Sequence, residues 1–288
     1  MATRTIYAGQ TVQITTPSAD LTGVFAVQSA SCDVARPIEF IPAYGHVDPV
    51  GAGQNTFTTC KSDIKLYLET GAAKYVRFDG AFINSLVSDA SKGYRTKIVV
   101  APNGFTFLGQ LNKLGLEVGM GSFGFATLSF NGLGEPFFDT GSAGLGWSEP
   151  KGTMMAPIAI TPTTSSNVAG SVTGFGCASS IKFNFDLPSE ILASAGENVT
   201  GAQTDLTKST FLAKFPFKTT IAVDGYGVNV NSLDELTNFS IATGIFTIQP
   251  INFNLVNPKI VAKSFNQSVG SVGASYNISL EGTSAIFS

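Results

Sequence analysis

The sequence is poor in the residues on which most catalytic and metal sites depend. Its 288 residues include one histidine, His46, and three cysteines, Cys32, Cys60 and Cys177. No CxxC, GxSxG or HExxH motif occurs, so neither a histidine-based triad nor a zinc site is indicated. An odd number of cysteines gives no disulfide framework, and we interpret all three as small buried apolar side chains. We therefore expect no enzyme activity, no catalytic residues, no cofactor and no metal.

Charge is also scarce. Charged residues make up 13% of the chain, against about a quarter in ordinary soluble domains, while 43% of the residues are hydrophobic. The resulting uncharged surface is tolerable where it is buried against other subunits. The net charge is −3, and no three Lys or Arg residues are consecutive, which excludes a clustered basic surface for binding nucleic acid. The chain lacks an apolar signal-peptide core and a transmembrane run, so we expect no membrane partner and folding in a cytosol.

The residues that are abundant favour β-structure. The chain has 31 Gly and 23 Phe with many Thr, Ser and Val, which is typical of short strands joined by tight turns. Alternating apolar residues predict strands over residues 24–34, 56–69, 94–101, 123–130, 172–185 and 211–223. A 3.6-residue apolar period predicts a helix over residues 79–91, ended by Gly93. The segment PIEFIPAYG, residues 37–45, predicts a short helical turn or bend, and residues 48–55 a loop.

The second half of the chain repeats short phrases of the first half in the same order. The matching segments, 146 to 151 residues apart, are PIEFIPAYG (37–45) with PSEILASAG (188–196), 56–66 with 204–214, 105–113 with 251–259, and Ser-x-x-Gly at 129–132 with 279–282. Ser232 and Glu235 form a capping box that predicts a counterpart helix over residues 232–239. We interpret the order as a domain duplication, with domains at 1–135 and 166–288. The alternative is chance alignment between segments rich in Gly, Phe and Ser.

Residues 136–165 join the two expected domains. This stretch is rich in Gly and Pro, as linkers and irregular loops are. Its aromatic residues Phe137, Phe138 and Trp147 predict that it docks on a domain or on a neighbouring subunit.

Two candidate sites for chemistry have ordinary structural explanations. His46 and Asp48 could form a base–acid pair, but a lone histidine in a Gly/Pro loop is more typical of a hydrogen-bonding turn residue. Residues 119–124 match GxGxxG, yet they precede an expected strand, so the helix N-terminus that binds phosphate is missing.

The candidate carboxylates and the glycosylation sequons also have ordinary explanations. The candidate carboxylates for calcium or paired acid chemistry are Asp186, Glu190, Asp234 and Glu235. Asp234 and Glu235 adjoin an expected helix start, where the helix dipole stabilises negative charge. Sequons begin at Asn198, Asn238, Asn266 and Asn277, and we discount them because the sequence shows no signal peptide.

The repeated Pro-x-Glu segment, the mid-domain helix and the closing strands ATLSFNG and YNISLEG resemble the tail tube proteins of long-tailed bacteriophages. The resemblance implies two tandem tail-tube-like β-sandwich or barrel domains, each flanked by a short α-helix. Single-domain members form stacked hexameric rings around a channel, and members with a duplicated domain can form trimeric rings with pseudo-sixfold symmetry. This chain departs from the pattern in its Gly-rich stretch over residues 132–162, which leaves the ring size open.

The resemblance implies a virion structural protein, made in the host bacterial cytoplasm, that self-assembles into the stacked rings of a tail tube. Such a tube is a conduit for DNA ejection and encloses the tape-measure protein and passing double-stranded DNA without binding DNA specifically. We expect a polar or acidic lumen poor in Lys and Arg. Candidate ring-stacking loops are residues 48–55, 71–74 and 198–203. The alternatives are a tail-terminator, neck or capsid decoration protein, or a carbohydrate-binding or hydrolytic β-protein with aromatic platforms and a carboxylate pair.

Overall fold

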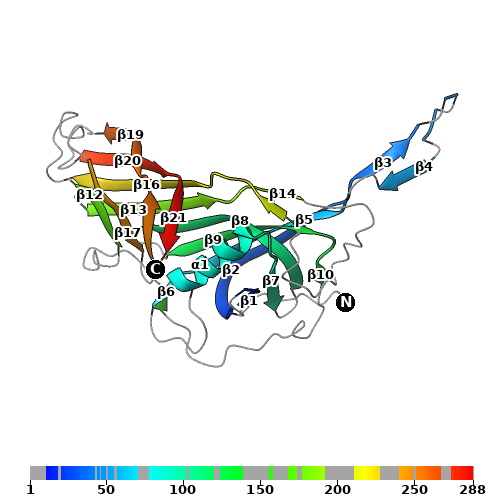
Figure 1. Cartoon of the computed structure of the whole chain (residues 1–288), viewed down its shortest axis with the longest axis horizontal. Helices are drawn as coiled ribbons and strands as arrows, with labels where there is room; N and C mark the ends of the chain where they lie inside the picture. Colours follow the sequence, from blue (N-terminus) through cyan, green and yellow to red (C-terminus); the bar gives the residue numbers. More distant parts are fainter. Residues whose placement is uncertain are drawn as a thin grey trace, which may run out of the picture.

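The computed structural model describes residues 11–18, 21–42, 44–45, 47–49, 51–54, 57–70, 78–101, 104–119, 124–138, 156–157, 168–173, 177–191, 211–227, 240–248, 251–266 and 274–287. Strands dominate these residues and one α-helix accompanies them, so the expectation of a mainly β fold is confirmed (Figure 1). The strands form one eleven-stranded sheet and several smaller sheets.

Six strands of the first half close into a barrel. In spatial order they are β1 (Thr11–Thr16), β2 (Leu21–Ala35), β5 (Thr59–Tyr67), β9 (Phe125–Leu133), β8 (Phe105–Gly119) and β7 (Thr96–Ala101). Each strand pairs antiparallel with the next, and β7 pairs with β1. Alternate residues such as Ile64, Leu66 and Leu128 fill the interior, because successive side chains of a strand point to opposite faces. The strands expected over residues 24–34, 56–69, 94–101 and 123–130 are confirmed.

The helix α1 (Gly80–Ser91) lies against the barrel and confirms the expected helix. The Asp79 side chain accepts a hydrogen bond of 3.0 Å from the backbone N–H of Phe82, which satisfies a free donor of the first turn. Gly93 follows the helix with φ of 76°, a left-handed conformation that suits glycine. Phe82, Leu86 and neighbouring apolar residues are fully buried, so one face of α1 belongs to the core.

The second half forms two sheets that face each other. The first contains β13 (Cys177–Asp186), β16 (Lys218–Gly227), β20 (Ala274–Gly282) and β19 (Lys259–Asn266). The second contains β12 (Val168–Thr173), β17 (Ser240–Ile248), β18 (Ile251–Val256) and β21 (Ser284–Phe287). The rings of Phe183 and Phe185 lie 5.6 and 6.0 Å from the ring of Phe287, so aromatic contacts join the two sheets.

The strands of the two halves pair in the same order. In the first half β2 pairs with β5 and β5 with β9; in the second half β13 pairs with β16 and β16 with β20. The directly facing residues are Ala30, Ile64 and Leu128 in the first half and Ile181, Val223 and Ile278 in the second. The pairing order β1–β7–β8 in the first half is likewise matched by the pairing order β12–β17–β18 in the second.

Residues 38–41 correct one prediction. Instead of a helical turn, β3 (Ile38–Ile41) pairs with β4 (Gly51–Gln54), which lies inside the stretch expected to be a loop. The turn prediction was wrong because it weighed Pro37 and Pro42 above the β-favouring Ile38, Phe40 and Ile41 between them. Figure 1 shows this hairpin projecting away from the rest of the described residues. We call residues 38–54 the arm.

The second half has a shorter hairpin at the corresponding place. β14 (Ser189–Ile191) pairs with β15 (Phe211–Ala213), and β15 contacts α1 of the first half. The expected helix over residues 232–239 and the loops 71–74 and 198–203 lie outside the described residues, with His46, Asp234 and Glu235.

Two short strands belong to the connection between the halves. β10 (Phe137–Phe138) pairs with β8, and β11 (Ala156–Pro157) pairs with β6 (Glu69–Thr70). Residues 137–138 and 156–157 of the connection therefore lie against the first half.

Candidate assembly interface

The candidate residues for acid chemistry do not come together. Asp186 faces Lys113 at 3.9 Å and Glu190 faces Lys214 at 2.9 Å, in separate exposed ion pairs. Asp48 is exposed. Among the described residues, no group of three or more His, Cys, Asp or Glu side chains could hold a metal ion.

The GxGxxG match lies where two strands meet. Gly119 is the last residue of β8, and β9 begins at Phe125, so a strand and not a helix follows the glycines. The phosphate-binding geometry of a helix N-terminus is therefore missing at this motif.

Two cysteine side chains lie on neighbouring strands. Cys60 of β5 is buried and Cys32 of β2 is half-buried, and both are free thiols. The hydrogen bond from Cys60 to Cys32 lowers the pKa of Cys32 and, together with burial, raises the pKa of Cys60. Cys60 fits the predicted small buried apolar residue, whereas Cys32 lies near an uncovered strand edge.

Eight strands form a continuous antiparallel row with one polar face. Their order is β19–β20–β16–β13–β8–β9–β5–β2. The strand register places six lysines and six carboxylates on the face opposite the core. They are Lys61, Lys65, Lys113, Lys182, Lys218 and Lys259, with Asp33, Asp63, Glu117, Asp186, Asp224 and Glu281.

Most of these lysines lie beside a carboxylate. The ion pairs are Lys61–Asp63 at 2.8 Å, Lys113–Asp186 at 3.9 Å, Lys182–Glu117 at 2.9 Å and Lys218–Glu281 at 3.1 Å. The hydrogen bond and charge of Glu117 raise the pKa of Lys182. The Nζ atom of Lys65 lies 4.1 Å from the centre of the Phe125 ring, a cation–π contact. Exposed pairs of this kind add little stability, but they neutralise the face locally.

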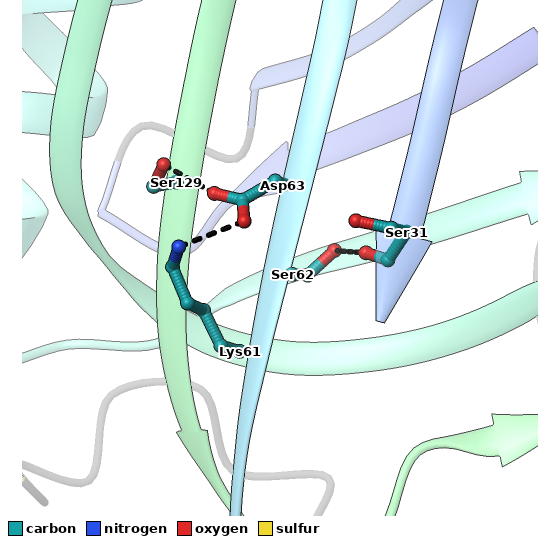
Figure 2. Close-up of polar contacts among 5 residues, drawn as sticks. All are labelled: Ser31, Lys61, Ser62, Asp63 and Ser129. Carbon is teal, nitrogen blue, oxygen red and sulfur yellow. Dashed lines mark hydrogen bonds and ion pairs between the residues drawn. The ribbon is translucent and has the colours of Figure 1, made fainter. Parts of the chain in front are cut away.

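Two separate sets of polar contacts join β5 to its neighbours, one to the outer part of β2 and one to β9 (Figure 2). The Ser129 hydroxyl donates to Asp63 at 2.5 Å, and the Ser62 hydroxyl donates to the backbone carbonyl of Ser31 at 3.0 Å. Burial tends to raise the pKa of Asp63, but the hydrogen bonds from Lys61 and Ser129 outweigh it and hold that pKa below its ordinary value. The carboxylate therefore stays ionised and fixes the side chains around it.

A second network lies on the same face in the other half. Asp224 accepts hydrogen bonds from the Ser180 hydroxyl at 2.8 Å and from the Asn277 side chain at 2.5 Å. Asp224 and Asn277 line a shallow polar cavity together with Ser264 and Asn266. One carboxylate among hydroxyls and amides supplies too little negative charge for a calcium site.

Among the described residues, the two halves of the chain meet in the sheet, at α1 and beneath the hairpin β14–β15. In the sheet, residues Lys113 to Gly119 of β8 pair with residues Ser180 to Asp186 of β13. At α1, Asn84 accepts a hydrogen bond of 3.3 Å from the backbone N–H of Phe287 and donates to its carbonyl. The hairpin β14–β15 lies over the ends of β2, β5 and β9 and encloses a cavity of about 370 Å³ with them.

Several counterparts of these contact surfaces are uncovered among the described residues. Among the described strands β19 pairs with β20 alone, and β2 beyond Val27 pairs with β5 alone, so each has one open edge. Phe287 is 2% exposed, but Phe137, which follows Gly132 as Phe287 follows Gly282, is 62% exposed. The arm carries Phe40, which is 65% exposed. β19 and the outer part of β2 are thus open edges, and the aromatic side chains of Phe137 and Phe40 are open to solvent.

Sequence reasoning missed the arm and both open edges. A signal for the arm was present, because Ile38 and Phe40 alternate with Glu39 as in an edge strand. The open edges left no local signal, since pairing depends on the whole topology. In the described residues no helix combines the length and apolar character needed to cross a membrane. Comparison of the chain with protein-family models and with curated proteins finds no match in either case.

Proposed function

We propose that this chain is a virion structural protein that self-assembles head to tail into rings, which stack to form a phage tail tube. The observation that carries the proposal is the junction between the halves. The chain joins β8 to β13 in one sheet and leaves open the strands that correspond to them, β19 and the outer part of β2. A second copy can therefore continue the sheet at either end.

A tandem duplication explains this correspondence. We propose that residues 1–135 and 166–288 are two tail-tube-like β-domains and that residues 136–165 connect them. The shared pairing order supports this, and so do the matching facing residues, which lie 150 to 159 positions apart. Three of the four matched sequence segments agree with this assignment, whereas the match of residues 56–66 with 204–214 does not, because the strand registers set Ile64 of β5 against Val223 of β16.

The proposed contact between copies pairs β19 of one copy with β2 of the next. Open strand edges carry unpaired N–H and C=O groups and associate readily, and here pairing would satisfy them. Because the two edges differ, the contact is heterologous and generates a ring when its rotation closes. Three copies with two domains each give pseudo-sixfold symmetry, and six copies are the other option.

The polar face of the eight-stranded row suits the wall of a channel. Its lysines are more numerous than expected from the sequence, but ion pairs neutralise four of the six. Phosphate binding depends on clusters of unpaired cations, so double-stranded DNA can pass without being held. In this proposal the tape-measure protein and DNA occupy the lumen, and the protein is made in the bacterial cytoplasm and ends in the virion tail.

Negative-stain electron microscopy of the purified chain across a concentration series tests the proposal. We expect rings with threefold or sixfold projections and stacks of such rings. Single rings that do not stack would favour a tail-terminator, neck or capsid decoration protein. A chain that remains monomeric by mass photometry and size-exclusion chromatography, even at high concentration, contradicts head-to-tail assembly.

A further inference from the structure

The arm exposes more apolar surface than a free hairpin in water favours. Ile38, Phe40 and Ile41 are 59%, 65% and 53% exposed, and all three belong to β3. An ion pair of 2.5 Å between Arg36 and Glu135 lies at the point where the arm leaves the barrel. A hairpin that is held at its base by an ion pair and exposes several apolar side chains is typical of a segment that docks on another protein surface.

The same chain shows what such a hairpin binds. In the second half, Ser189, Ile191 and Phe211 of β14–β15 line a cavity against the first half. The opposite wall consists of Asp33, Val34 and Ala35 of β2, Thr59, Cys60 and Lys61 of β5, and Asn131 and Gly132 of β9. At this contact Phe211 is 2% exposed, whereas Ile191 is 39% exposed.

The arm and the hairpin β14–β15 occupy equivalent positions. β3 follows β2 after Arg36 and Pro37, and β14 follows β13 after Leu187 and Pro188. In this alignment Phe40 corresponds to Ile191. The proposed sheet contact between copies would therefore place the arm over the second half of the neighbouring copy, as β14–β15 lies over the first half of its own chain.

We infer that the arm docks on the second domain of the neighbouring copy, in the place that β14–β15 occupies on the first domain of its own chain. The inference rests on the proposed head-to-tail assembly. The seat follows from the strand registers and consists of the residues there that are not buried in the single chain: Asn184 and Asp186 of β13, Lys218 and Thr220 of β16, and Glu281 and Gly282 of β20. The occupant is thus a second copy of this chain, bound within a ring and not between stacked rings.

Photo-crosslinking locates the contact without changing the native cysteines. Phe40 is replaced by benzoylphenylalanine in the full chain, the assembled protein is irradiated, and the linked peptides are identified by mass spectrometry. We expect links between copies to residues 184, 186, 218, 220, 281 or 282. The same replacement at Ile191 is the positive control, because it should link within one chain to β2, β5 or β9 even in monomers.

The possible outcomes distinguish a failure of the docking inference from a failure of the assembly proposal. Rings that form while Phe40 links to another arm, or to a different surface, overturn the docking inference and leave the tube proposal intact. Absence of any link between copies overturns the inference, whether or not rings form. A chain that never assembles contradicts both proposals, while the Ile191 control still reports on the fold.

A surface variant gives an independent measurement. The double variant Ile38→Ser, Phe40→Ser removes apolar side chains that are exposed in the single chain, so its melting temperature should equal that of the native protein. We expect its assembly to need at least about tenfold more protein, because buried aromatic anchors dominate interface energetics. Ile286→Ser, at a residue 59% exposed on β21, is the matched control and should assemble normally. Normal assembly of the double variant contradicts the inference.

Discussion

Proline substitution in β19 tests the open edge most directly. Successive residues of a strand turn their N–H groups to opposite sides, so Lys263 and Ser264 donate in opposite directions. Proline removes the N–H group, and is tolerated only where that group does not pair within the fold. Of Lys263→Pro and Ser264→Pro, one therefore breaks the pairing with β20, and the other disturbs the open edge alone. The variant with the native melting temperature identifies the edge-facing position.

The size of the effect follows from the internal junction. β8 and β13 pair over seven facing residue pairs, and the proposed contact between copies is its counterpart. Proline deletes one hydrogen bond and leaves a partner carbonyl buried without a donor, a loss of about 2–3 kcal/mol. At about 1.4 kcal/mol for each tenfold change, association weakens about 30- to 140-fold.

Mass photometry across a dilution series measures that shift, and circular dichroism with thermal unfolding selects the correctly folded variant. We expect the folded variant to remain monomeric at concentrations where the native chain forms rings. If the variant with the native melting temperature assembles at native concentrations, β19 does not pair between copies.

Three further predictions concern the fold itself. Asn84→Ala should lower the free energy of unfolding by about 1–3 kcal/mol in urea titrations, because both backbone groups of Phe287 lose their partner; an unchanged midpoint refutes that role. Gly132→Ala should lower the free energy of unfolding by about 1–3 kcal/mol, and by more than Gly282→Ala does. The reason is that an added Cβ would lie 2.7 Å from a main-chain oxygen at Gly132 and 3.0 Å from one at Gly282. Equal urea midpoints for the two variants contradict this order. Burial raises the pKa of Asp89, so the fold loses stability as the pH rises from the ordinary pKa of an aspartate to the raised value, and the loss is complete above it. Asp89→Asn should therefore stabilise the chain by about 1 kcal/mol at pH 7, with a gain that fades in acid when thermal unfolding is followed against pH.

The elements that sequence reasoning predicted are those with a local burial pattern. Ile64, Leu66 and Leu68 alternate because one face of their strand points into the barrel. Phe82 and Leu86 recur at helical spacing because one face of α1 is covered. In both cases the neighbours along the chain carry the information, so periodicity alone finds the element.

The arm was missed because its second strand has no strand-forming sequence. β4 consists of Gly51, Ala52, Gly53 and Gln54, which have low β propensity. It becomes a strand by pairing with β3, whose own signal was masked by two prolines. Such a hairpin is set by backbone hydrogen bonds between its strands and not by side-chain pattern.

The candidate interface lay beyond sequence reasoning for a different reason. β2 pairs with β1 over its first six residues and with β5 over the remainder, and β8 is divided in a similar way between β7 and β13. Which part of a long strand stays open depends on where each partner ends. That property arises from the assembled sheet, whereas the repeated phrases at Gly132 and Gly282 indicated only that the two halves are comparable.

The covalent link between the halves alters the kinetics of joining them. Because β8 and β13 belong to one molecule, their contact forms at the effective concentration set by the connection, in the millimolar range for short flexible linkers, whatever the protein concentration in the cell. The matching contact between β19 and β2 would form only on encounter. Half of the contacts between domains in such a ring would then be complete before any two molecules meet. The protein concentration would control only the other half, the contacts between copies.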